Sequence, residues 1–183
     1  MKALILALLL GFAAPSPAPA TVPDHGTVPD RSLVPDYGGA WTLDEARSTG
    51  LPPFYAQVES HRLRVAQTDA RLSVDVEIRS GGAEPERFAF VYALDGGETS
   101  TTTRIRTPNG PLEVPTRLHA RHGDDGRLHI TITREMTRGG QTINATGTEA
   151  WELAPDGRTL TVHRVEQMPQ GGEMRFMMVF VRG

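Results

Sequence analysis

The chain contains no cysteine, so a disulfide bond, a lipid attached through cysteine and a cysteine nucleophile are all excluded. The chain also lacks a large excess of positive or negative charge. The formal net charge is -3, and the basic residues, which are all arginine apart from Lys2, are interspersed with carboxylates. Because no basic stripe forms, we expect neither a nucleic-acid partner nor an anionic membrane surface.

Motifs of the common hydrolases and nucleotide-binding proteins are missing as well. The sequence has no Gly-x-Ser-x-Gly turn, no His-Glu-x-x-His and no glycine-rich phosphate loop at the junction of a strand and a helix. We therefore predict no catalytic residues, no cofactor and no enzymatic activity. An enzyme built on loop carboxylates stays an alternative, because a fold does not exclude activity.

Residues 1–20 have the pattern of a secretory signal peptide. Lys2 precedes a short apolar run over residues 3–14, and Ala18 and Ala20 supply the small residues of a cleavage site. The run is too short to cross roughly 30 Å of hydrocarbon, and no other stretch reaches the roughly 20 apolar residues of a spanning helix. We expect an exported protein, periplasmic or secreted, without stable membrane insertion.

Residues 21–37 contain a repeat of six residues in which Val-Pro-Asp recurs. Regularly placed proline removes backbone donors and prevents a continuous helix or strand, so an extended, solvated tether is predicted. As an alternative, the aspartates of the repeat form a docking or cation-binding arm.

Alternating polar and apolar residues dominate the remainder, residues 38–183. Residues 71–79 alternate strictly, and residues 88–94 and 128–132 repeat the pattern. Asp-Gly and Gly-Gly pairs separate these segments at regular intervals. The pattern predicts an all-β protein, a meandering barrel or sandwich. Of the two we expect the barrel, an antiparallel meander of eight to ten strands closed on itself. Residues 174–181, apolar on both faces, are expected to close the sheet against the first strand, and residues 43–48 are the only helical candidate.

Three hairpins are predicted at turn sequences that tolerate a positive φ. Two follow from the turns at residues 95–97 and 124–126. In the third, which turns at residues 155–157, pairing of Leu153 with Leu160 also brings Trp151 opposite Val162, so one face stays apolar.

Several of these segments resemble small exported bacterial lipocalin-like β-barrel proteins. The resemblance lies in residues 39–48, which begin Gly-Ala-Trp, and in residues 94–98, 151–162 and 178–182. In lipocalins a Gly-x-Trp closes the bottom of the barrel and a late arginine packs on the tryptophan. The resemblance therefore implies that Trp41 is a plug with Arg182 as its partner, or Arg175 as second choice. The chain departs from the lipocalin pattern in having no Thr-Asp-Tyr motif, no disulfide and no room for a C-terminal helix.

The resemblance and the apolar faces imply that the barrel holds an apolar or amphipathic small molecule without catalysis. The residues predicted to bind this ligand are Trp41, His61, Phe88, Phe90, Tyr92, Trp151, Phe176 and Met178. The alternative is a solid core. In that case the protein is an interaction module of the cell envelope, which contacts a partner through the exposed run Thr99–Thr103 or through the tether.

Some polar residues share the phase of apolar neighbours. Glu59 and His61 are in phase with Leu63, and Arg164 and Glu166 are in phase with Leu160. A buried charge without a partner costs several kcal/mol, so these residues need a hydrated cavity, a mutual pair or a bulge that turns them outward. We favour the bulge.

The loop between the two predicted strands that carry His119 and His129 allows two pairing registers. A loop of five residues, 122–126, places His119 directly opposite His129, whereas a loop of three residues, 124–126, places Arg121 opposite His129. Because either register lacks the third and fourth ligands of a zinc site, we predict no metal site.

Overall fold

The computed structural model describes residues 34–107, 110–138, 141–167 and 171–183. The predicted signal peptide and most of the predicted tether lie outside the described residues. None of the helices in the described part of the chain has the length and hydropathy needed to cross a membrane.

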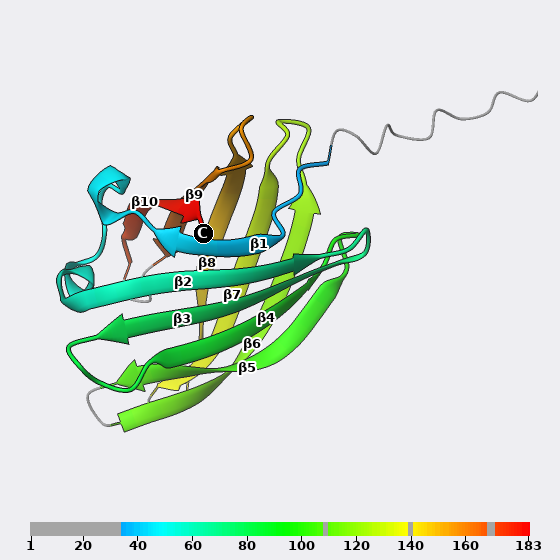
Figure 1. Cartoon of the computed structure of the whole chain (residues 1–183). Helices are drawn as coiled ribbons and strands as arrows, with labels where there is room; N and C mark the ends of the chain where they lie inside the picture. Colours follow the sequence, from blue (N-terminus) through cyan, green and yellow to red (C-terminus); the bar gives the residue numbers. More distant parts are fainter. Residues whose placement is uncertain (1–33, 108–109, 139–140, 168–170) are drawn as a thin grey trace, which may run out of the picture. The chain divides into compact units, whose positions relative to one another are not determined.

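Ten strands follow one another along the chain in a single antiparallel sheet (Figure 1). They are β1 (Gly39–Leu43), β2 (Val58–Gln67), β3 (Arg71–Ser80), β4 (Glu86–Ala93), β5 (Glu98–Thr107), β6 (Gly110–His122), β7 (Leu128–Arg138), β8 (Gln141–Leu153), β9 (Thr159–Gln167) and β10 (Glu173–Arg182). The predicted all-β meander is confirmed. It is an up-and-down arrangement of the kind found in lipocalin barrels.

The first and last strands pair, as predicted, with Trp41 opposite Arg182. The order β4-β3-β2-β1-β10-β9-β8-β7-β6-β5 therefore leaves β4 and β5 as the two edges of a nearly closed barrel. The hairpin predicted between these strands at residues 95–97 is wrong. Leu94 N–H donates to Ala70 C=O at 2.9 Å, which continues the pairing of β4 with β3, and β5 pairs with β6, so β4 and β5 form no ladder with each other.

The other two predicted hairpins form. In the β8–β9 hairpin Leu153 lies opposite Leu160 and Trp151 opposite Val162, which confirms the predicted register. In the β6–β7 hairpin the loop is the shorter of the two alternatives, and Arg121 lies opposite His129. His119 and His129 are therefore not directly opposite.

One end of the barrel, which we call the filled end, is packed with apolar side chains that are almost fully buried. They are Tyr37, Trp41, Leu128, Leu160 and Phe180. Trp41 Nε1 donates to Tyr37 C=O at 2.9 Å, and the Arg182 guanidinium lies 4.4 Å from the centre of the Trp41 ring. The predicted packing of Arg182 on Trp41 is confirmed. Packing of the barrel begins at Tyr37, just before the predicted boundary at Gly38.

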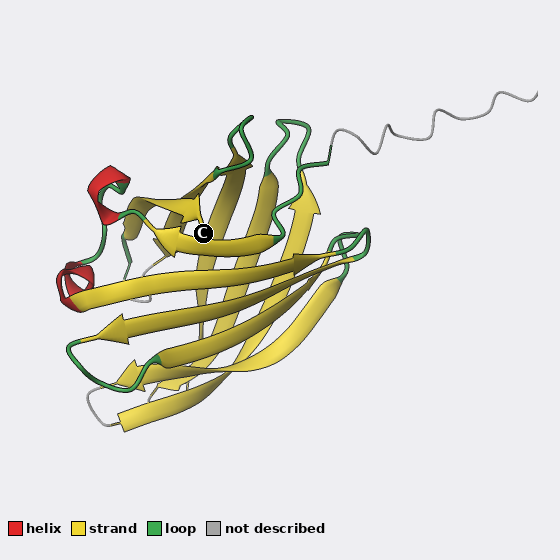
Figure 2. Ribbon diagram, viewed as in Figure 1, coloured by secondary structure: helices red, strands yellow, loops and turns green. Residues whose placement is uncertain are grey.

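Two short 3₁₀ helices lie between β1 and β2 (Figure 2). The first, η2 (Glu45–Arg47), falls inside the predicted helical segment, and the side chain of Asp44 caps it by accepting from Arg47 N–H at 3.2 Å. The second, η3 (Pro53–Gln57), was not predicted. It starts at a proline, which suits the first turn of a helix, and it buries Tyr55.

Candidate functional site

Burial changes along the barrel interior. At the opposite end from Trp41, near the β3–β4 turn, several inward-facing side chains are only half-buried, although Val114 and Thr103 beside them are buried. This half-buried end consists of Val76, Phe88, Phe90, Met136, Met174 and Phe176. Strand pairing places Val76 opposite Phe88, whereas Met136 lies on β7 and Met174 and Phe176 lie on β10. The interior is thus filled at one end and partly accessible to solvent at the other.

Between the two ends lies a group of charged side chains, which we call the charged layer: Arg134 on β7, Glu149 on β8, and Arg164 and Glu166 on β9. Glu149 is its most buried member, with 8% of its surface exposed. One carboxylate oxygen accepts from Trp151 Nε1 at 2.7 Å and the other from Arg164 Nη1 at 2.5 Å. Both oxygens of Glu149 therefore have a strong donor.

Arg164 connects the two carboxylates of the layer. Besides Glu149, it donates to Glu166 Oε1 from Nε at 2.8 Å and from Nη2. Burial lowers the pKa of Arg164, but the neighbouring Glu149 and Glu166 carboxylates outweigh this effect and raise the pKa above its ordinary value. The guanidinium is held in its charged form.

Arg134 is less well satisfied. Its Nη1 lies 3.9 Å from Glu166 Oε1, and its buried Nε has no hydrogen-bond partner among the described residues. Burial first, and then repulsion by Arg164, lower the pKa of Arg134. The charged layer therefore contains one cation whose donors are not matched by acceptors.

Tyr55, His61 and Met178 form a second polar group beside the layer. The Tyr55 hydroxyl lies 3.2 Å from His61 Nδ1 and 3.4 Å from Met178 Sδ. Burial lowers the pKa of His61 to about 4, with a smaller contribution from Arg164, and burial raises the pKa of Tyr55 to about 12. Both rings are neutral at neutral pH.

An aromatic strip runs along β4 toward the half-buried end. The ring of Phe90 stacks on both neighbours, with centroids 6.4 Å from Phe88 and 6.3 Å from Tyr92. Burial, and then the charge of Glu149, raise the pKa of the Tyr92 hydroxyl above its ordinary value. The strip thus presents flat apolar surface that ends at a protonated hydroxyl.

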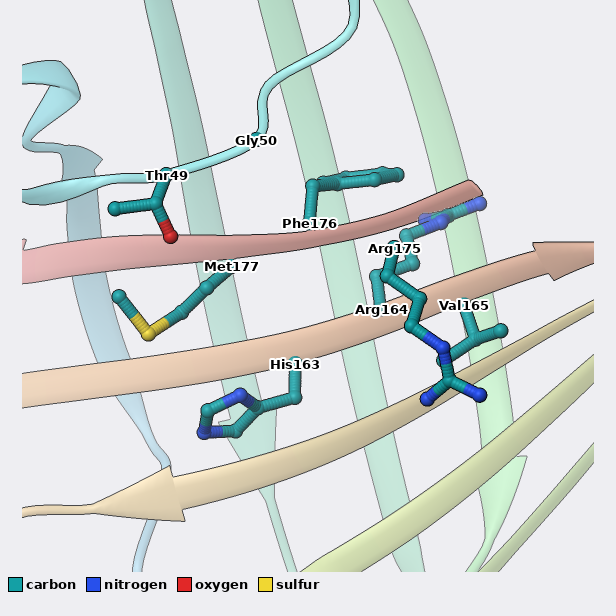
Figure 3. A pocket seen from close by; sticks show the side chains of 8 residues that line it. All are labelled: Thr49, Gly50, His163, Arg164, Val165, Arg175, Phe176 and Met177. Carbon is teal, nitrogen blue, oxygen red and sulfur yellow. The ribbon is translucent and has the colours of Figure 1, made fainter. Parts of the chain in front are cut away.

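A pocket with a volume of about 360 Å³ opens outside the apolar barrel interior. It is lined by Thr49, Gly50, His163, Arg164, Val165, Arg175, Phe176 and Met177 (Figure 3). The pairs His163–Met177 and Val165–Arg175 occupy alternate positions to the inward Val162 and Met178, so they face outward. The pocket therefore opens between outward-facing side chains of β9 and β10, while Arg164 and Phe176, which also line it, belong to the inward face.

The predicted ligand-binding residues fall into separate places. Trp41 and Trp151 pack in or next to the filled end, and His61 and Met178 join Tyr55. Phe88, Phe90 and Tyr92 form the aromatic strip, and Phe176 lies under Arg164, whose guanidinium carbon is 6.0 Å from the centre of the ring. The structure brings all but the tryptophan plug toward the charged layer or the half-buried end. Their role in binding stays a prediction.

The favoured bulge is found at only one of the in-phase polar residues. Glu59 lies at an irregular step in the β2–β3 register and is exposed, accepting from Gly82 N–H at 3.0 Å. For His61, Arg164 and Glu166 the bulge is wrong, because regular pairing keeps them facing inward. Arg164 and Glu166 instead form the mutual pair that was the second alternative.

Three members of the site were missed: Tyr55, Arg134 and Glu149. Glu149 is in phase with Trp151, and Arg134 is in phase with Ile132, so the alternation that singled out Arg164 could have found both. Tyr55 had no such signal, since it lies on the short helix η3 and not on a strand.

The threonine run on β5 is not uniformly exposed, so that part of the interaction hypothesis is wrong. Alternation turns Thr99, Thr101 and Thr103 inward. Thr103 is 5% exposed, and its hydroxyl lies 2.7 Å from Thr116 Oγ1. Only Ser100 and Thr102 remain exposed.

Among the described ranges, no group of three or more histidine, aspartate or glutamate side chains is placed to hold a metal ion. The nearest approach is His129, whose Nε2 lies 3.0 Å from Asp125 Oδ1 in the β6–β7 loop. This pair is half-exposed and lies apart from the charged layer.

Comparison with known proteins finds structural similarity only. No protein-family model matches the chain, and no curated protein matches it. Among solved structures, lobster apocrustacyanin A1 matches over 86% of this chain and 64% of that one, with 13% sequence identity and a TM-score of 0.37. The chain therefore spans less than two thirds of the crustacyanin chain. The strand pairing by itself defines a nearly closed, ten-stranded antiparallel barrel.

Proposed function

We propose that the barrel binds an amphipathic small molecule, with the apolar part against the half-buried end and the polar part at the charged layer. The observation that carries the proposal is the change in burial along the interior, from the filled end at Trp41 to inward-facing aromatic and methionine side chains that stay partly exposed. Inward apolar surface left in contact with water is the feature expected of a binding barrel.

Two physical effects support this assignment. Covering apolar surface contributes roughly 25 cal/mol per Å², and Met136 and Met174 at the half-buried end can repack around ligands of different shape. The ion pairs of Arg164 hold the charged layer in a defined geometry before a ligand arrives, which lowers the ordering cost of binding.

The proposal includes export and the absence of catalysis. Export is supported by residues 1–20, with the Lys2 charge, the apolar run and the Ala18–Ala20 cleavage pattern. Intact-mass measurement of the protein recovered outside the cytoplasm should show a chain that begins at about residue 21. A full-length mass starting at Met1 would contradict export by this route.

Fluorescence titration with N-phenyl-1-naphthylamine, a neutral apolar probe, tests the binding proposal. We expect saturable enhancement with the wild-type protein and weaker binding to Phe90→Ala, which truncates the middle of the aromatic strip. Phe54→Ala is the matched control, because Phe54 is 58% exposed on η3. Equal binding to all three proteins, or no saturable binding to the wild type, would contradict an interior site.

A second candidate, the envelope interaction module, is favoured by a different observation. β4 and β5 form the unpaired edges of the sheet, and an edge strand offers backbone groups to an incoming strand. In-cell cross-linking of the wild type and of Thr102→Pro, which removes a donor from β5, tests it. Loss of a cross-linked product only in Thr102→Pro would favour the module, and identical products would exclude the β5 edge.

A further inference from the structure

Arg134 is the member of the charged layer with unused binding capacity. Arg164 directs three donor atoms at carboxylates, and both oxygens of Glu149 are occupied. Arg134 has only the contact of 3.9 Å with Glu166, and its buried Nε–H has no acceptor in the described part of the chain. Arg134 Nε–H is therefore the buried donor that the layer itself leaves unpaired.

The hydroxyl on the strand next to Arg134 does not pair with its Nε–H, and Glu149 and Tyr92 act on Arg134 electrostatically without a hydrogen bond to that Nε–H in the described part of the chain. Thr116 lies opposite Arg134 on β6, but its hydroxyl is engaged by Thr103 at 2.7 Å and by Val114 C=O at 3.1 Å. An unpaired buried donor costs free energy, and the cost is larger when the donor is charged. A negatively charged acceptor would give the unpaired donor a hydrogen bond and would offset the repulsion between Arg134 and Arg164.

On the basis of the binding function proposed above, we propose that the polar end of the ligand is a carboxylate and that the Arg134 guanidinium binds it. The planar guanidinium fork matches two carboxylate oxygens, which a single hydroxyl cannot do. A cationic head group would instead face Arg134 and Arg164 across the same layer. Arg134 thus favours amphipathic carboxylates over neutral or cationic amphiphiles of equal chain length.

Displacement of N-phenyl-1-naphthylamine by dodecanoate, dodecanol and dodecyltrimethylammonium, each below its micelle concentration, tests the head group with the chain length held constant. We expect dodecanoate to displace the probe at a concentration about tenfold lower than dodecanol, as expected for a charge-assisted hydrogen bond. Dodecyltrimethylammonium should be the weakest of the three.

Arg134→Met, which keeps the length of the side chain and removes the donors, should raise the dodecanoate concentration to that of dodecanol and leave dodecanol unchanged. Arg104→Met is the control, because Arg104 lies outside on β5, where its side chain is 69% exposed and pairs with Glu113. Circular dichroism tests whether each variant is folded. If Arg134→Met does not fold, the carboxylate assignment is tested by the order in which the three compounds displace the probe from the wild-type protein.

The outcomes separate the two proposals. Probe binding with equal displacement by dodecanoate and dodecanol, or a dodecanoate preference that survives in Arg134→Met, would overturn the carboxylate assignment and leave the binding function standing. If the probe does not bind and no compound binds by calorimetry, the binding function fails, and the head-group assignment fails with it.

Discussion

The filled end and the charged layer belong to the same barrel interior, yet they are stabilised by different interactions. At the filled end, Trp41, Leu160 and Phe180 are almost fully buried among apolar neighbours. In the charged layer, Arg164 is held by hydrogen bonds to Glu149 and Glu166. Apolar packing is nearly independent of direction, whereas each buried charge depends on a particular partner.

This difference explains why binding is assigned to one region and stability to the other. At the filled end the Tyr37 hydroxyl donates to Trp151 C=O at 3.1 Å, and His122 Nε2, on the residue opposite Leu128, is a buried ring nitrogen without a partner among the described residues. In the charged layer the unpaired buried atom is Arg134 Nε, which belongs to a cation. An unpaired charged donor costs more free energy than an unpaired neutral group, so the charged layer is the better candidate for binding.

The largest expected effect is loss of the plug. Trp41→Ala removes a large buried side chain and the Arg182 contact, so we expect the free energy of unfolding to fall by about 4 kcal/mol, measured by urea denaturation. Phe54→Ala, an exposed aromatic, should change it by less than about 0.5 kcal/mol. Similar values for the two variants would contradict the distinct role of the filled end.

A smaller loss is expected when one carboxylate of the charged layer is neutralised. Glu149→Gln keeps the shape of the side chain but removes the charge that faces Arg164, and we expect a cost of about 2 kcal/mol. The control is Glu152→Gln on the same strand, whose exposed ion pair with Arg127 should contribute less than about 1 kcal/mol.

A double-mutant cycle sharpens this test. Because Glu149 and Arg164 share a hydrogen bond, the cost of Glu149→Gln combined with Arg164→Met should be less than the sum of the single costs. Strict additivity would show that the two residues do not act as a unit.

The third expected effect depends on pH. The pKa of His61 is lowered to about 4 in the folded protein, against an ordinary value of about 6.5 in the unfolded chain. Between these values the unfolded chain binds the additional proton, so stability is full above about pH 6.5 and is lost as the pH falls toward 4. The slope from this residue is at most about 1.4 kcal/mol per pH unit.

Denaturation curves at several pH values check this effect. His61→Gln should flatten the slope between pH 4 and 6.5, and His163→Gln should not, because His163 is exposed on the outer face. An unchanged slope in His61→Gln would mean that the buried imidazole does not control acid stability.

Local pattern was enough to predict much of the fold. Strict alternation over residues 71–79 predicts β3, since side chains of a strand point to opposite faces. The turn at residues 155–157 also sets the partner of Trp151, because a short hairpin fixes its register locally. The Trp41–Arg182 contact came from the resemblance to lipocalins and not from spacing.

The sequence by itself determined which residues face the same way along each strand, because that periodicity is a local property of the backbone. It could not decide where the barrel stays open, since β4 pairs only with β3 and β5 only with β6 once the whole sheet has formed. Nor could it show that Glu149 meets Arg164 or that Arg134 is left without an acceptor. Those contacts join different strands, so only the tertiary structure, through sheet register and curvature, decided them.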